Sequence, residues 1–224
     1  MNKYELVRKI EKFAPLDIQE PWDASGWVID NGFSEIKKVM FALTITDDVY
    51  DQALIKNCDM IISHHPLFYV PLKYKNIDMY CSHTNFDKTF GGTTDLLIKA
   101  LGFVGETYGD FVRIVEFEKE MSVEYLKLKL LYLSPKLRMV NNNDVKMVKK
   151  VAFCAGSGSE FINKTPCDAY VTGDIKFHTA VESNKVLFDI GHFESEIFAV
   201  KFLRELTGLS EMEGIIAHEK SPFI

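Results

Sequence analysis

The chain has 224 residues, of which 47% are hydrophobic, and a net charge of -6 from 26 basic and 32 acidic residues. This length can bury one large core or two modest ones, and the acidic balance argues against nucleic acid as a partner, because no overall positive field would attract a phosphate backbone. No segment reaches the ~18 consecutive apolar residues of a membrane span, and the N-terminal region lacks the apolar stretch of an export signal. We therefore expect a soluble, cytoplasmic protein without a membrane partner.

Short apolar runs rich in Val, Ile and Phe predict strands. In chain order they cover residues 39–45, 60–63, 77–82, 112–117, 151–155, 169–172 and 186–190. Segments with helical periodicity separate most of these runs, at residues 49–56, 94–101, 123–133, 177–183 and 197–206. Strands that alternate with helices predict an α/β fold in which the sheets are mostly parallel.

Some of these predicted strands resemble one another in order. The segment 37–41 (KKVMF) matches 149–153 (KKVAF), and 58–65 (CDMIISHH) aligns with 167–174 (CDAYVTGD), at offsets of 112 and 109 residues. Matches in one order at nearly one offset predict an internal duplication. The alternative is that buried strands resemble one another by chance.

The offset of 109 residues also pairs His83 with His192 and Asp87 with Glu196. We therefore expect two related α/β halves, with a boundary between residues 105 and 106. The half 1–105 carries the His-His and His-x-x-x-Asp motifs, and the half 106–224 carries the Thr-Gly-Asp and Gly-His-x-x-x-Glu motifs. The C-terminal helix is free to pack back on the first half.

Two adjacent histidines, His64 and His65, directly follow the predicted strand 60–63 and precede Pro66. The carboxyl end of a strand is where α/β proteins place their sites, and the proline stops further strand pairing. Neutral imidazole is a common ligand of zinc, iron and similar ions, and two neighbours can reach two ions or opposite sides of one. The structural alternative is one core histidine beside one exposed histidine.

Two further polar clusters follow predicted strands, at residues 83–87 (HTNFD) and 191–196 (GHFESE). In the second, a four-residue helical step brings the carboxylate of Glu196 to the side that His192 faces. A mixed set of nitrogen and oxygen ligands suits Zn, Fe, Mn or Co rather than calcium, and a bridging carboxylate can hold two ions ~3.5–4 Å apart. We therefore predict a site for two divalent metal ions, with the ligands His64, His65, Asp87, His192 and Glu196.

Other polar residues near these clusters have open roles. We interpret His83 as a partner of a ligand or a structural residue, and the segment 22–26 (WDASG) as core or interface. Asp174 and His178 occupy the place in the second half that the histidine pair occupies in the first, which makes them candidates for contacts with a metal ligand or with the substrate. The alternative for Asp174 is that it caps the helix that follows it.

The ordered motifs resemble the NIF-three-like family, whose members are often labelled GTP cyclohydrolase I type 2 homologues. They are the segments 22–26, 59–66, 83–87 with the glycines at 91–92, 171–175, and 191–196. The resemblance implies that the five predicted ligands bind a dinuclear metal centre, and that two-part subunits form a toroidal homohexamer. The chain is similar to the short form of the family, which lacks an inserted domain.

The resemblance also implies a reaction, the hydrolytic opening of the guanine imidazole ring of GTP, with Asp174 or His178 transferring protons. Two cations with shared ligands lower the pKa of bound water toward ~7, which favours hydrolysis of a small, nucleotide-type substrate. One alternative is a phosphoester or nucleotide phosphohydrolase, which would release phosphate instead of formate. Another is a non-catalytic metal-binding scaffold ring, although five ligands on two ions leave open positions, as catalytic sites do.

Overall fold

The computed structural model describes residues 1–223 as two compact units. The first unit comprises Met1–Thr89 together with the chain from Ala199 onward, and the second comprises Phe90–Phe198. The boundary expected between residues 105 and 106 falls inside the second unit. Residues 90–108 already belong to that unit, because they form one of its helices and an edge strand of its sheet. The C-terminal helix belongs almost entirely to the first unit.

The first unit is built on a five-stranded sheet of order β1-β4-β3-β2-β11. Its elements are α1 (Lys3–Phe13), η1 (Leu16–Ile18), β1 (Gly26–Ile29), β2 (Val39–Ala42), α2 (Asp47–Ile55), β3 (Met60–Ser63), η2 (Leu72–Tyr74), β4 (Asp78–Cys81), α3 (Thr84–Lys88), α8 (Phe198–Thr207) and β11 (Gly214–Ile216). All strands of this sheet are parallel except β1, which pairs antiparallel with β4 at one edge.

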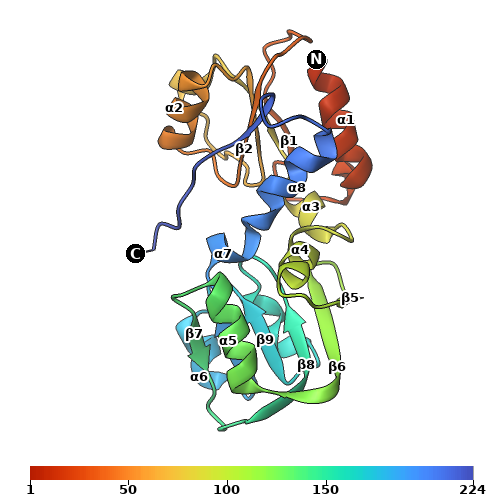
Figure 1. Ribbon diagram of the computed structural model, residues 1–224, viewed down its shortest axis with the longest axis vertical. Coiled ribbons are helices and arrows are strands. Elements are labelled where there is room, and N and C mark those ends of the chain that lie inside the picture. Colours follow the sequence, from red (N-terminus) through yellow and green to blue (C-terminus); the bar gives the residue numbers. More distant parts are fainter. Residues whose placement is uncertain (224) are drawn as a thin grey trace. The chain divides into compact units, whose positions relative to one another are not determined.

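Helices cover both faces of this sheet, with α2 on one side and α1 and α8 on the other (Figure 1). The α2 face is apolar at alternate strand positions, as a pleated strand requires. Its core joins strand residues Met40, Ala42, Ile61 and Met79 to helix residues Val49, Tyr50 and Ala53. The helix begins where Thr46 accepts a hydrogen bond from the amide of Val49, and two aspartates in its first turn favour that end.

The second unit is built on a six-stranded sheet of order β5-β6-β8-β9-β10-β7. Its elements are α4 (Thr93–Ala100), β5 (Glu106–Tyr108), β6 (Val112–Ser122), α5 (Val123–Leu133), β7 (Arg138–Val140), β8 (Met147–Phe153), η3 (Ser159–Lys164), β9 (Ala169–Thr172), α6 (Phe177–Glu182), β10 (Val186–Asp189) and α7 (His192–Glu196). Its central strands β8, β9 and β10 are parallel, and antiparallel strands flank them.

Both faces of the central strands in the second unit are buried. On β9, Ala169 and Val171 face a core that includes residues of α4 and α5, while Tyr170 faces the opposite core with Ile162 of η3. A strand with two buried faces needs apolar residues at every position. This need explains why β9 and β10 stand out as continuous apolar runs in the sequence.

The two units repeat one arrangement, which supports the predicted duplication. Each has an antiparallel strand beside three parallel strands in the order third, second, first: β1-β4-β3-β2 and β7-β10-β9-β8. The backbone amides of residues 37 and 38 donate to the carboxylate of Asp59, and those of residues 149 and 150 donate to the carboxylate of Asp168. In both units, an aspartate before the second strand thus binds two successive backbone amides, which lie just before β2 in the first unit and within β8 in the second.

One detail of the predicted alignment is wrong by one residue. The amide of Asp87 donates to the carbonyl of His83, as the amide of Ser195 donates to the carbonyl of Gly191. His83 therefore corresponds to Gly191 rather than to His192. The segment that connects the second and third parallel strands is one residue shorter in the second unit, which shifts the offset.

The four cysteines, Cys58, Cys81, Cys154 and Cys167, are free thiols, and all but the last are buried. Among residues 1–223, no helix is long and apolar enough to span a membrane.

Candidate metal centre

His64 directly follows the buried strand β3 and is itself completely buried. Its Nδ1 lies 2.9 Å from the carbonyl oxygen of Ser82. Because a carbonyl can only accept, Nδ1 carries the proton and Nε2 presents a lone pair. Nε2 lies 3.4 Å from Oδ1 of Asp87. Metal-binding histidines commonly donate their other ring N–H to such a backbone carbonyl, which fixes the tautomer.

His65 is fixed in a similar way at the next position of the chain. Its Nδ1 lies 2.7 Å from Oγ1 of Thr44, which follows β2, and its carbonyl accepts a hydrogen bond of 2.8 Å from Ser63. The ring centroids of His64 and His65 are 5.1 Å apart. The two imidazoles are therefore held side by side, as their adjacency after a strand predicts.

Asp87 reaches His64 because α3 is anchored in the core of the first unit. Phe86, the preceding residue, is fully buried, and its ring packs 5.5 Å from Phe13 of α1 and 6.1 Å from Phe202 of α8. Phe86 thus fixes the short helix that carries the carboxylate.

His83 lies closer to the histidine pair than the sequence indicates. Its ring centroid is 5.3 Å from that of His64 and 5.7 Å from that of His65, and one ring nitrogen of each of the three histidines lies within 4.8 Å of the others. Its Nδ1 lies 2.9 Å from Oδ1 of Asp23. The first unit therefore groups three imidazoles with Asp87.

Asp23 is a supporting residue that sequence reasoning missed, because it lies in the segment interpreted as core or interface. Burial alone would raise the pKa of Asp23, but hydrogen bonds from His83, Thr84 and Ser25 hold that pKa well below its usual value. Asp23 lies 60 positions from His83 in the chain. No local spacing rule joins residues so far apart; only the resemblance of the whole segment to a family motif pointed to it.

The second unit carries its own imidazole and carboxylate cluster on α7. His192 and Glu196 lie one helical turn apart, and Nε2 of His192 is 3.0 Å from Oε2 of Glu196, as the four-residue spacing predicts. Nδ1 of His192 lies 2.7 Å from Oδ2 of Asp174. Burial alone would lower the pKa of His192, but the two carboxylates raise it to about 10. In the protein without metal, a protonated His192 therefore bridges two anions at neutral pH.

Glycines allow the close packing of this second cluster. A Cβ at Gly156 would lie 2.2 Å from Oε1 of Glu196, and a Cβ at Gly173 would lie 2.7 Å from the amide nitrogen of His192. Gly156 also has a φ of +68°, a conformation that side chains disfavour. Its amide donates to Ser195, which fixes the loop after β8 against α7.

The two predicted catalytic residues differ in their surroundings. Asp174 contacts His192 and does not cap α6, because the N-cap residue of that helix is Lys176. His178 lies on α6 with an exposed side chain, and its ring contacts the ring of Phe177 at 5.6 Å. The structure thus brings Asp174 to a predicted ligand, whereas it shows His178 in contact with a neighbour on its own helix.

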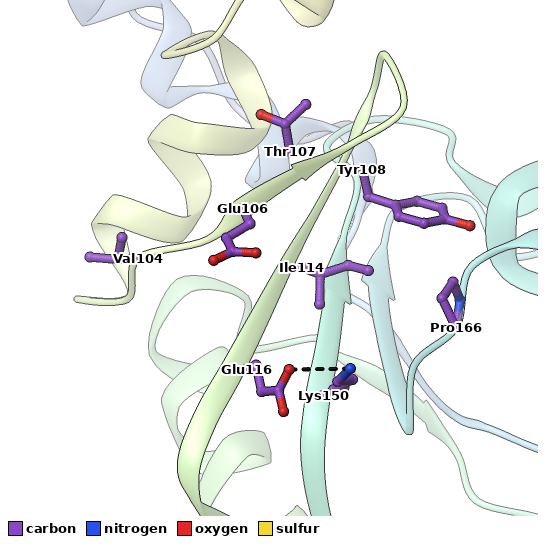
Figure 2. A pocket seen from close by; sticks show the side chains of 8 residues that line it. All are labelled: Val104, Glu106, Thr107, Tyr108, Ile114, Glu116, Lys150 and Pro166. Atoms are coloured by element: carbon purple, nitrogen blue, oxygen red, sulfur yellow. Dashed lines mark ion pairs between the residues drawn. The ribbon is translucent and has the colours of Figure 1, made fainter.

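A separate hollow in the second unit lies over β5, β6 and β8 (Figure 2). Lys150 in this hollow pairs with Glu116 at 3.2 Å, so these two charges neutralise each other. Its lining contains no histidine or cysteine. It therefore lacks the imidazole nitrogen that both clusters contain.

The donor set of both clusters fits divalent transition metals. Each cluster combines imidazole nitrogen with a carboxylate, and such mixed sets bind Zn, Fe, Mn or Co. Each also has a histidine whose Nδ1 is held by an oxygen acceptor, Ser82 for His64 and Asp174 for His192. Acceptors of this kind orient metal-binding histidines.

Comparison with known proteins places the chain in a family. Residues 1–219 match the family described as Duf34/NIF3 (NGG1p interacting factor 3). A protein of Campylobacter jejuni named GTP cyclohydrolase 1 type 2 homolog is 32% identical over 100% of this chain and 99% of its own length. One of Clostridium acetobutylicum with the same name is 30% identical over 94% of this chain and 91% of its own length.

Solved structures share the fold of this chain. Reduced HcgD from Methanocaldococcus jannaschii has a TM-score of 0.83 at 26% identity, covering 96% of this chain and 97% of that chain. The protein TTHA1606 from Thermus thermophilus has a TM-score of 0.86 at 21% identity and covers 100% of both chains, which shows the same fold. The chain belongs to the Duf34/NIF3 family.

Proposed function

We propose that His64, His65, Asp87, His192 and Glu196 bind two divalent metal ions, and that the protein is a metal-dependent hydrolase of a nucleotide-type substrate. The observation that carries the proposal is the state of His64, whose Nδ1 is occupied by a carbonyl while Nε2 is directed at the carboxylate of Asp87. A lone pair beside a carboxylate in a buried site is suited to a cation.

The chain's own residues have distinct roles in this proposal. Thr44 orients His65, and Asp174 orients His192 through Nδ1. Glu196, which is buried, keeps an oxygen against Nε2 of His192, so a cation bound there would replace the proton that they share. The metal pair would supply an activated water for hydrolysis.

The substrate class rests on the names of the relatives. Proteins named GTP cyclohydrolase 1 type 2 homolog match nearly the whole chain, so we propose GTP as the first substrate to test. Hydrolytic opening of its imidazole ring would leave a formyl group on one nitrogen, and hydrolysis of that formamide by a second water would release formate. Asp174 and His178 remain our candidates for proton transfer; an alanine at either position should abolish turnover while leaving some metal bound.

The decisive experiment measures metal content together with formate and phosphate release from GTP. We expect the wild type to bind two ions per chain and to release formate, and we expect His64→Ala and Glu196→Ala to lose metal and activity. His218→Ala is the matched control, because His218 is exposed and lies outside both clusters. Phosphate without formate would identify a phosphohydrolase instead.

Two other outcomes would change the proposal. Two ions without turnover of nucleotides would favour a metal-binding scaffold. A wild type that binds no divalent ion would refute the metal centre itself.

We also propose that the subunit assembles into a homohexamer in the cytoplasm, as the family resemblance implies. The chain mass is 25.6 kDa. Light scattering should therefore give a mass near six times this value, and a mass equal to that of the single chain would exclude the ring.

A further inference from the structure

We infer that His83 is an additional metal ligand, which supplies a third imidazole nitrogen beside His64 and His65, and that Asp23 positions it. This inference rests on the proposed metal centre and extends its ligand set. It also assigns a role to the segment 22–26, which sequence reasoning interpreted as core or interface.

The tautomer of His83 follows from its contact with Asp23. Nδ1 of His83 lies 2.9 Å from a carboxylate oxygen of Asp23. A carboxylate oxygen can only accept a hydrogen bond, so Nδ1 carries a proton. In the neutral ring, the lone pair is therefore on Nε2. Among residues 1–223, no group of the protein forms a hydrogen bond with this Nε2, so it is available to a ligand.

Asp23 is itself held rigidly, so that it can fix the ring of His83. Its side chain is fully buried, and its second oxygen accepts hydrogen bonds from Ser25 at 2.7 Å and from Oγ1 of Thr84 at 2.5 Å. Ser25 in turn accepts a hydrogen bond of 3.0 Å from the backbone amide of His83. The backbone and the ring of His83 are thus both bound to the same short segment of the chain.

The position of His83 is that of a ligand rather than of a core residue. Its side chain is 17% exposed to solvent, and one of its ring nitrogens lies within 4.8 Å of a ring nitrogen of His64 and of one of His65. Atoms that bind one ion at ~2.0–2.1 Å lie at most about twice that distance apart, so small side-chain movements suffice to close the site. A buried structural histidine would have both nitrogens bound by protein groups.

The arrangement of Asp23, His83 and a metal ion is chemically familiar. Metal-binding histidines donate their other N–H to a carboxylate, which fixes the tautomer and increases the basicity of the ligand. Three imidazole nitrogens with an open fourth position form one type of catalytic zinc site. Asp23 is then a positioning residue, because it acts through His83 and not on the ion.

The test compares the affinity of His83→Gln, Asp23→Asn and wild type for Co²⁺ and Zn²⁺ by chelator competition, together with the visible absorption spectrum of the Co²⁺ forms. We expect both variants to lose about 10- to 100-fold in affinity for one ion. His83→Gln should also change the Co²⁺ spectrum because a nitrogen ligand is lost, whereas Asp23→Asn should retain a histidine-ligated spectrum. Added imidazole should restore the spectrum of His83→Gly.

Controls separate this inference from the metal centre itself. His218→Ala should match the wild type, and circular dichroism should confirm that the variants are folded. If the wild type binds metal and His83→Gln has the same affinity and spectrum, the inference about His83 is wrong while the metal centre stands. A wild type that binds no Co²⁺ or Zn²⁺ would overturn both.

Discussion

The first unit and the second unit repeat one strand order, but they place different chemistry after it. The first gathers three imidazoles, His64, His65 and His83, with two carboxylates, Asp87 beside His64 and Asp23 beside His83. The second places one imidazole, His192, between two carboxylates, which raise its pKa to about 10. The repeated strand order therefore fixes where these side chains leave the sheet, and the loops after the strands determine how many imidazoles and carboxylates meet there.

The units differ again at the first residue of their corresponding helices. Both α1 and α5 precede the antiparallel strand, and both begin after a side chain that caps the helix, Asn2 or Ser122. The first helical residue is Lys3 in α1 and Val123 in α5, and both are buried. Equivalent positions thus hold an ion pair in one unit and an apolar contact in the other.

The largest effect is expected from removing this buried charge. Lys3 donates to Asp78 at 2.5 Å and to Asp30 at 2.6 Å, so Lys3→Met leaves the buried carboxylate of Asp78 without a positive partner. Loss of one partner of a buried pair costs about 3–5 kcal/mol. We expect a large decrease in the urea midpoint followed by tryptophan fluorescence, which reports the first unit because its two tryptophans, Trp22 and Trp27, both lie there.

Two further variants test the reason for that decrease. Lys3→Met combined with Asp78→Asn should recover part of the lost stability, because no charge is then left uncompensated. Val123→Ala in the second unit should cost only about 1–2 kcal/mol, since it removes apolar contact without exposing a charge; circular dichroism follows this variant, because the second unit contains no tryptophan. An unchanged midpoint in Lys3→Met would show that the ion cluster does not stabilise the first unit.

A second prediction concerns the carboxylate of the second unit. In Gly156→Ala the new Cβ would lie 2.2 Å from Oε1 of Glu196, so the carboxylate must move away from His192. We expect metal affinity to decrease about 10- to 100-fold, measured by chelator competition.

The matched control for this clash is Gly102→Ala. Gly102 lies in the same unit with a φ of +75°, but no atom lies within 4 Å of its expected Cβ. Gly102→Ala therefore introduces the same backbone strain of about 1–2 kcal/mol as Gly156→Ala, but no clash. Equal metal loss in both variants would mean that strain, and not the position of Glu196, controls binding.

The contrast between the units also shows how far the sequence could predict the structure. The buried parallel strands β3 and β9 were predicted with their bounds, because both faces of each are apolar. The short strands β1, β5, β7 and β11 were not predicted, since three or four partly exposed residues produce no apolar run. They pair at sheet edges, where the partner strand and not the local sequence determines the conformation.

The candidate site shows the same limit. The contact of His192 with Glu196 was predictable from a helical step, and that of His64 with Asp87 from strand ends that share one edge of a sheet. The contact between His83 and Asp23 was not, because it depends on how the chain before β1 folds over the end of β4. Local periodicity predicts neighbours within an element, whereas long-range contacts require the fold.

A smaller effect is expected at the support of His65. Thr44→Val removes the hydroxyl that lies 2.7 Å from Nδ1 of His65 and changes the shape of the side chain little. Loss of an orienting partner costs about 10-fold or more in metal affinity, so we expect a decrease near that lower value without a change in the urea midpoint. Thr44→Ser, which keeps the hydroxyl, should retain wild-type metal affinity. If Thr44→Ser loses as much metal affinity as Thr44→Val, packing of the side chain, and not the hydroxyl, is responsible.

The smallest effect is a pH dependence confined to the first unit. Hydrogen bonds from Lys3 and from the amide of Gly32 lower the pKa of Asp30. A carboxyl group with a lowered pKa contributes stability above its unfolded value of ~3.9, and this contribution is lost as the pH falls through the folded value. Below pH 5, the free energy of unfolding of the wild type, followed by tryptophan fluorescence in urea, should decrease. We expect this decrease to be smaller in Asp30→Asn, by less than about 1 kcal/mol because Asp30 is partly exposed. A variant that loses stability on acidification as steeply as the wild type would mean that Asp78 alone balances the charge of Lys3.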